Sequence, residues 1–274
     1  MKNNCRIKQK FLSLTKADKS ALITFLTAGD PDFKKCSEIL NKLPELGVDI
    51  IELGMPFSDP MADGPVIQNS YKRSLAGGNT MSKTINLVKD FRKIDQNTPI
   101  VLMGYYNPIY QIGIKRFLKK IKDAGVDGLL IVDLPPETIH EVYQEAEVLN
   151  IKLIQLASPT TDIKRIKNIL KHANGFLYYI SITGITGSKI SNFLKIEKSY
   201  KKLKKNIKIP FVVGFGINSP SKAKNIASYA DGVVIGSAII NQIDYSLKNK
   251  GNVAYNVFST VKKYSKAILE ARKK

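Results

Sequence analysis

Eight short, nearly continuous apolar runs alternate with amphipathic stretches along this chain, and this alternation constrains the fold more than any other feature. Strands that are buried on both faces have this pattern, because a parallel sheet covered by helices has no face toward solvent. The stretches between the runs are typical of helices; segment 33–46, for example, places Cys36, Ile39 and Leu40 on one side. The apolar runs occupy residues 21–26, 49–53, 100–103, 128–132, 152–156, 176–180, 211–213 and 232–235.

Eight buried strands that alternate with helices can close into a barrel or form an open, doubly wound sheet. The number of runs favours the barrel, and no Gly-x-Gly-x-x-Gly fingerprint follows the first run. Glycines also follow the seventh and eighth runs, where barrels often bind phosphate. We therefore predict an α/β fold, a (β/α)8 TIM barrel that forms a single domain over residues 1–274.

Some expected elements lie outside the simple repeat. An extra N-terminal helix is predicted at residues 6–16, before the first strand. The connection after the second run is too long for one loop, so we expect an extended loop with a helical turn near residues 66–75. Asp162 and the pair Ser219-Pro220 are typical helix starts, and a helix over 137–149 is expected after Pro135-Pro136.

The net charge of +20 raises the alternative of a nucleic-acid-binding protein. Most of the lysines, however, fall at polar positions of predicted helices, and no RNP motif, zinc finger or aromatic-basic alternation accompanies them. We therefore expect an ordinary enzyme with no nucleic-acid partner.

Cysteine, histidine and hydropathy patterns exclude further classes. Cys5 and Cys36 have no motif spacing, so neither a disulfide framework nor a metal site is predicted. His140 and His172 lie in polar helical stretches and are expected to be exposed. No apolar stretch reaches the roughly 18 residues of a membrane span, and the basic N-terminus lacks the apolar segment of a signal peptide. A cytoplasmic protein with no membrane partner is expected.

Two carboxylates mark a candidate catalytic centre after the second run. Glu52 lies inside an apolar strand, where burial should raise its pKa and let it exchange protons near neutral pH; the alternative is a structural ion pair with a lysine. Asp63 follows in a loop stiffened by proline, above the expected barrel mouth. Carboxylates in unlike surroundings tend to titrate apart and take separate roles.

Glycines at the ends of three consecutive strands indicate a phosphate site. Gly184 and Gly187 follow the sixth run, Gly216 follows the seventh, and Gly236 with Ser237 follows the eighth. Glycine lets backbone N–H groups approach a phosphate, and a helix that opens at Ser237 would add its positive end. Tight turns alone are the alternative. No lysine stands at a strand end where it could form a Schiff base. We therefore predict acid–base isomerisation or carbon–carbon cleavage of a small phosphorylated substrate.

Several of these segments carry a family resemblance. Residues 25–31 (FLTAGDP) resemble the first-strand motif of the tryptophan synthase alpha subunit family, and residues 52–65 (ELGMPFSDPMADGP) are similar to its long signature almost residue for residue. Segments 184–187, 214–217 and 236–238 resemble its phosphate-binding segments. The motifs appear in family order over nearly the whole chain.

The resemblance implies a lyase that cleaves indole-3-glycerol phosphate to indole and glyceraldehyde 3-phosphate by a retro-aldol reaction. Glu52 matches the general acid–base, Asp63 the carboxylate that holds the indole N–H, and Tyr178 a tyrosine close to the glutamate. Segment 183–193 resembles a loop that closes over substrate, although Ile182 stands where some members carry arginine. The positions similar to the indole pocket are Phe25, Tyr105, Leu130, Leu156 and Phe215.

The resemblance also implies a partner, a pyridoxal-phosphate beta subunit in an α2β2 heterotetramer, with no cofactor and no metal in this chain. The partner surface is expected on the loop rim around Pro56 to Asp63 and at Asn107-Pro108. Two rival readings remain open: another phosphate-binding barrel, such as a phosphosugar isomerase, and a non-catalytic barrel that only activates a beta-like subunit. The long loop after Glu52 argues against the first, and the presence of both carboxylates argues against the second.

Overall fold

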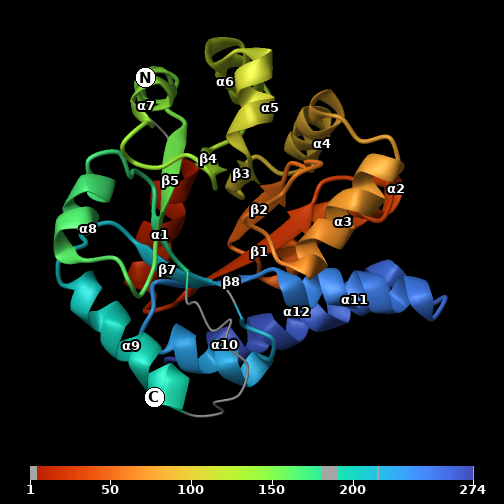
Figure 1. Cartoon of the computed structure of the whole chain (residues 1–274). Coiled ribbons are helices and arrows are strands. Elements are labelled where there is room, and N and C mark those ends of the chain that lie inside the picture. Colours follow the sequence, from red (N-terminus) through yellow and green to blue (C-terminus); the bar gives the residue numbers. More distant parts are fainter. Residues whose placement is uncertain (1–4, 181–190, 215, 274) are drawn as a thin grey trace.

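The computed structural model describes residues 5–180, 191–214 and 216–273, and the side chains of 191–193 are not described. Eight parallel strands form a closed barrel in sequence order, with β8 pairing back onto β1, and helices surround it (Figure 1). The predicted (β/α)8 barrel is therefore confirmed. The strands are β1 (Ala21–Thr27), β2 (Ile50–Gly54), β3 (Ile100–Gly104), β4 (Gly128–Ile131), β5 (Lys152–Ala157), β6 (Leu177–Ile180), β7 (Phe211–Gly214) and β8 (Gly232–Ile235).

The helices of the described residues connect the strands and cover the barrel. Side chains cap several of them; Asp162 accepts a hydrogen bond from the Arg165 N–H and Ser219 accepts one from Lys222, as the sequence predicts. The helices are α1 (Arg6–Lys16), α2 (Phe33–Lys42), the 3-10 turn η1 (Pro44–Leu46), α3 (Pro65–Ala76), α4 (Met81–Ile94), α5 (Tyr106–Ile112), α6 (Ile114–Asp123), α7 (His140–Val148), α8 (Ile163–Leu170), α9 (Ser191–Lys204), α10 (Pro220–Ala227), α11 (Ser237–Lys248) and α12 (Val253–Leu269).

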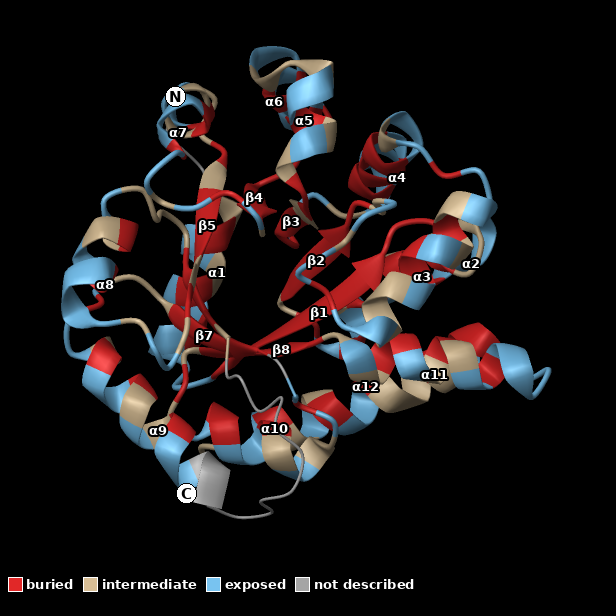
Figure 2. Ribbon diagram, in the orientation of Figure 1, coloured by how far each residue is buried: buried red, intermediate tan, exposed pale blue. Residues whose placement is uncertain are grey.

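Two apolar clusters hold the barrel together, one between strands and helices and one inside the barrel. The strands are buried almost throughout, whereas the helices are buried only along the side that faces them (Figure 2). In the inner cluster, Ile7, Phe11 and Leu14 of α1 pack with strand residues such as Ile23 and Ile50. Helix α1 therefore closes the barrel at the end where the strands begin, and the opposite end is left for a site.

Three expectations need correction. The connection after β2 holds two full helices, α3 and α4, rather than one turn. Helix α7 begins at His140 instead of 137, because the N–H and hydroxyl of Thr138 both donate to the Pro135 carbonyl and form a turn first. His140 is exposed as expected, but His172 is half-buried with its ring edge against Tyr143. None of the described helices combines the length and apolar character needed to cross a bilayer.

Candidate active site

Glu52 lies in the middle of β2, paired in register with Phe25 of β1 and Val101 of β3. Its side chain is only 2% exposed, and its Oε1 atom has no hydrogen-bond partner among the described residues. Burial, and secondarily the charge of Asp63, raises the pKa of Glu52 to about 8. The alternative of a structural ion pair with lysine does not hold within the described residues. A carboxyl group with this pKa can both give and accept a proton near neutral pH.

Asp63 ends the loop that follows β2 and is held by a network of hydrogen bonds. The Tyr105 hydroxyl donates to Asp63 Oδ2 at 2.6 Å and accepts from the Ala62 N–H at 3.1 Å. Gln68 donates to the Asp63 carbonyl at 2.8 Å, so the backbone on both sides of the carboxylate is fixed. Asp63 is 9% exposed, less deeply buried than Glu52. Burial raises the pKa of Asp63, and the bond from Tyr105 opposes that rise.

Tyr178 of β6 brings a hydroxyl to the same place. Burial raises its pKa well above the ordinary value, and the charges of Glu52 and Asp63 add to the rise, so the phenol stays protonated. Its ring occupies space that only a glycine leaves open: a Cβ on Gly214 would lie 2.2 Å from the Tyr178 hydroxyl oxygen. Gly214 at the end of β7 is therefore required for the position of Tyr178.

These side chains share one cavity of about 360 Å³ at the carboxyl ends of the strands. Larger hollows of about 740 and 550 Å³ flank α1 at the opposite end, where the strands begin. Barrel enzymes place their active sites at the carboxyl ends, which favours the smaller cavity. It is lined by Phe25, Glu52, Asp63, Gly64, Pro65, Val66, Ile67, Met103, Tyr178, Gly216, Ile217, Asn218, Val234, Gly236, Ser237 and Asn241.

Other residues that line the cavity have the features of an anion site. Gly216 has a φ of 71°, which glycine adopts without strain, and Gly236 precedes the first residue of α11, Ser237. The free N–H groups and dipole at the start of this twelve-residue helix favour a negative charge there. Gly184 and Gly187, together with Ile182 and the segment resembling the closing loop up to residue 190, lie outside the described residues.

The five positions expected around an indole ring separate into distinct groups. Phe25 lines the cavity, whereas Tyr105 lies behind Asp63 as its hydrogen-bond donor. Leu130 is buried in the inner cluster, and Leu156 packs against that cluster. Neither residue is among those that line the cavity. Phe215 lies outside the described residues.

Several residues that line the cavity are not among those predicted from the sequence. Val66 and Ile67 belong to the first turn of α3, and Asn218 and Asn241 come from the segment after β7 and from α11. A search restricted to strand ends cannot find residues that reach the cavity from helices. Within the described ranges, no group of three or more His, Cys, Asp or Glu side chains could hold a metal ion.

Comparison with known proteins identifies the family of the chain. A family model for the tryptophan synthase alpha chain matches residues 11–269. The chain is similar to the crystal structure of tryptophan synthase subunit alpha from Legionella pneumophila str. Paris, with 38% identity and a TM-score of 0.91 over 97% of this chain and 98% of that chain. It is also similar to a structure of tryptophan synthase from M. tuberculosis, with 28% identity and a TM-score of 0.85 over 96% of this chain and 98% of that chain. The chain therefore belongs to the tryptophan synthase alpha chain family, lyases that cleave indole-3-glycerol phosphate to indole and glyceraldehyde 3-phosphate.

Proposed function

We propose that Glu52, Asp63 and Tyr178 carry out this cleavage within one barrel domain that spans residues 1–274. The observation that carries the proposal is the pair of carboxyl groups in one cavity, with the pKa of the buried Glu52 raised to about 8. A single group with that pKa can supply one proton and remove another within a turnover.

The proposed reaction balances with Glu52 as the only proton carrier. Protonated Glu52 gives its proton to the indole ring carbon that bears the side chain, which places positive charge on the ring nitrogen. The carboxylate of Asp63 accepts a hydrogen bond from that N–H and stabilises the charge. Ionised Glu52 then removes the proton of the glycerol hydroxyl, the carbon–carbon bond breaks, and its electron pair returns to the ring. Indole and an aldehyde are released, and Glu52 is again protonated.

Tyr178 supports this cycle as a hydrogen-bond donor near Glu52. Its raised pKa keeps the phenol neutral over the working pH range, so it adds no further negative charge to the cavity. The tyrosine can therefore stabilise the ionised form of Glu52 that follows the first proton transfer.

The two ends of the substrate are assigned to opposite sides of the cavity. We place the phosphate at Gly216, Gly236 and Ser237, and also at Gly184 and Gly187 outside the described residues. The start of α11, where Gly236 supplies no side-chain cap, supports this assignment. The indole ring would contact Phe25 and the apolar residues Ile67 and Val234, which line the same cavity. Tyr105, Leu130, Leu156 and Phe215 would act behind these contacts or beside them.

A beta subunit is the partner that the family implies, and we propose an α2β2 assembly in which pyridoxal phosphate belongs to that subunit alone. The proposed contact surface is the rim formed by residues 56–63 and 107–108. Met61 is 82% exposed on this rim, and Tyr110 of the adjacent helix α5 is 61% exposed, as expected of apolar side chains that a partner would cover. We place the assembly in the cytoplasm, in keeping with the biosynthetic family to which the chain belongs.

The test is indole release from indole-3-glycerol phosphate by the purified chain, with and without a beta subunit. We expect slow release from the chain alone and faster release with the partner. Folded protein that releases no indole in either condition would contradict the assigned reaction. Release that a beta subunit does not change would contradict the proposed partner while leaving the reaction intact.

A further inference from the structure

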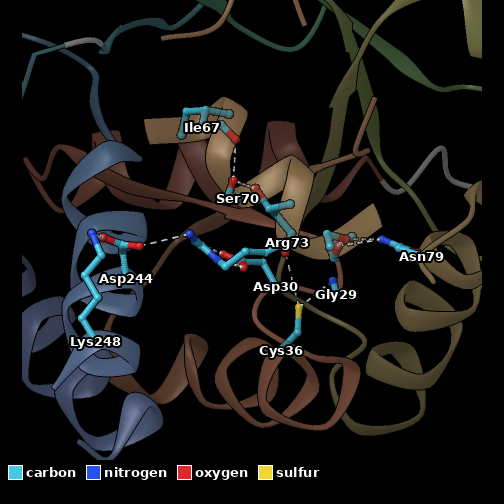
Figure 3. A network of polar contacts seen from close by, with 12 residues as sticks. Gly29, Asp30, Cys36, Ile67, Ser70, Arg73, Asn79, Asp244 and Lys248 are labelled. Atoms are coloured by element: carbon cyan, nitrogen blue, oxygen red, sulfur yellow. Dashed lines mark hydrogen bonds and ion pairs between the residues drawn. The ribbon is translucent and has the colours of Figure 1, made fainter. Parts of the chain in front are cut away.

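Arg73, in the last turn of α3, joins three elements through one guanidinium group (Figure 3). Its Nε and Nη2 atoms donate to the two carboxylate oxygens of Asp30 at 2.7 and 2.9 Å. Its Nη1 atom donates to Asp244 of α11 at 3.3 Å. Asp244 is also paired with Lys248 one turn later, at 2.6 Å. Side chains from the turn after β1, from α3 and from α11 thus meet at one residue.

The Arg73–Asp30 pair is not explained by stability alone. The Asp30 side chain is fully buried, and burial raises its pKa in spite of the opposing bonds from Arg73. Taking two charges out of water costs about as much as their attraction returns, so a buried pair is weak evidence of net stabilisation. A fork-shaped, three-contact arrangement does fix relative orientation, which a hydrophobic contact does not.

The junction between α3 and β1 is already secured by other bonds. The hydroxyls of Thr27 and Ser70 lie 2.6 Å apart, and both Ser74 and Asn79 donate to the Ala28 carbonyl, at 2.5 and 2.6 Å. The bond to Asp244 differs from these because it extends the same network to α11. Its loss would leave the β1–α3 junction in place.

The three elements that Arg73 joins also form one wall of the cavity. Phe25 comes from β1, Ile67 from the first turn of α3, and Asn241 from α11. Asn241 and Asp244 are three residues apart and therefore project from neighbouring positions of one helix face. The side of α11 next to the cavity is thus continuous with the side that binds Arg73.

We propose that Arg73 is a positioning residue that holds the phosphate-binding start of α11 at a fixed distance from the Asp63 end of the cavity. Helix α3 begins two residues after Asp63, and α11 begins at Ser237, so the guanidinium group links the elements that carry the two ends of the site. This inference rests on the proposed function. It assigns a role in substrate affinity to a residue that does not line the cavity.

The test compares variants that weaken the link between Arg73 and Asp244 of α11 with matched controls. In the full chain, Asp244→Asn removes the charge that links α11, and Arg73→Lys keeps a cation but not the three-point geometry. Asp18→Asn is the control, because Arg272 Nη1 contacts Asp18 Oδ1 at the same 3.3 Å beside the hollow that flanks α1. Lys248→Gln controls for the second partner of Asp244.

We expect Asp244→Asn and Arg73→Lys to raise KM for indole-3-glycerol phosphate about tenfold with kcat changed little, because a displaced α11 loses ground-state binding. Binding of glycerol 3-phosphate, measured by calorimetry, should weaken by the same factor. Both controls should match the parent chain in KM, and melting temperatures are measured in parallel.

Unchanged KM and glycerol 3-phosphate affinity in both network variants, with normal turnover by the parent chain, would overturn the inference alone. A fall in melting temperature with KM unchanged would also overturn it, because the network would then be only structural. A parent chain without turnover would instead contradict the proposed function and the inference together. If Asp244→Asn does not fold, Arg73→Lys decides the same question.

Discussion

At the scale of single residues, the site depends on the contrast between two carboxyl groups. Glu52 has no hydrogen-bond donor for its buried Oε1 within the described residues, whereas Asp63 accepts a 2.6 Å bond from Tyr105. Glu52 lies in a strand whose other residues are all buried and apolar, which explains its unpaired oxygen. Asp63 lies in a loop, where the hydroxyl of Tyr105 can reach its carboxylate. The same side-chain chemistry therefore has different proton affinities at two places in one cavity.

Replacing Glu52 by glutamine should remove catalysis without removing binding. The amide keeps the shape of the side chain but cannot exchange protons, so we expect kcat to fall by about 10²–10⁴-fold. Substrate KM should stay within a small factor of the parent value. Steady-state indole release checks this, with circular dichroism as the control for folding. Near-normal turnover would remove Glu52 from the mechanism.

The same variant makes a prediction about stability and pH. The folded-state pKa of Glu52, about 8, lies above its ordinary value of 4.5, so between these pH values the folded protein holds a proton that the unfolded chain has released. The stabilisation associated with this proton is complete below about pH 4.5 and is lost as pH rises toward 8. Glu52→Gln should remove a decline of up to about 1.4 kcal/mol per pH unit. Urea unfolding at pH 5 to 8 measures it; parallel curves for the two proteins would contradict the raised pKa.

Tyr105 is expected to act through Asp63. Among the described residues, the Tyr105 hydroxyl is the only side-chain donor to the Asp63 carboxylate, and a hydrogen bond to a charged group contributes about 1.5–3 kcal/mol. We predict that Tyr105→Phe lowers kcat/KM about tenfold or more. Tyr110→Phe, at an exposed tyrosine of the next helix, is the matched control. Equal rates in the two variants would show that Asp63 does not need this donor.

At the scale of elements, the sequence predicts strands better than it predicts what surrounds them. The eight apolar runs locate β1 to β8, because a strand buried on both faces is apolar along nearly its whole length. Helix α3 was underestimated, since its mixed composition, with Gln68, Asn69 and Ser70 in its middle, gives a weak amphipathic signal. Its first turn reaches the cavity, so part of the site was missed for the same reason. Leu130 and Leu156 show the converse, because apolar residues near strand ends need not face the cavity.

The junction between β6 and β7 gives a prediction at this scale. A methyl group on Gly214 would overlap the ring of Tyr178, so Gly214→Ala should displace that ring as well as strain the strand pair. Overpacking of this kind costs about 1–3 kcal/mol. We expect a lower melting temperature and a loss of kcat beyond that seen in equally destabilised variants.

Gly77→Ala is the control for this substitution. Its new methyl group would meet only backbone oxygens at 3.4 Å, and its φ of −74° suits any residue. Activity and melting temperature should both stay near the parent values. Gly214→Ala with normal activity would show that the position of Tyr178 is not critical.

At the scale of the whole molecule, charge is the dominant unusual property. The chain has 43 Lys and Arg against 23 Asp and Glu, and most ion pairs among the described residues lie at the surface, where each contributes little. The excess positive charge therefore repels itself across the surface of a barrel whose apolar core is extensive. The fold is maintained by burial, and electrostatics work against it.

Screening that repulsion should stabilise the protein. Because the Debye length falls from about 30 Å at 0.01 M salt to about 8 Å at 0.15 M, we predict that melting temperature rises over this range of sodium chloride. Differential scanning calorimetry measures the change, and potassium glutamate in place of sodium chloride controls for specific chloride binding. A melting temperature that falls with salt would mean that the surface ion pairs outweigh the net repulsion.

Because helix α1 closes the barrel where its strands begin, the barrel is open to small molecules at one end only. Ile7, Phe11 and Leu14 fill the space where the strands begin, so nothing the size of an indole can leave in that direction. Substrate and both products must then enter and leave at the carboxyl ends of the strands, and a product that is still bound there excludes the next substrate. A segment or partner that covers this opening therefore controls product release as well as substrate entry. A partner that removes indole would free the site for the next substrate.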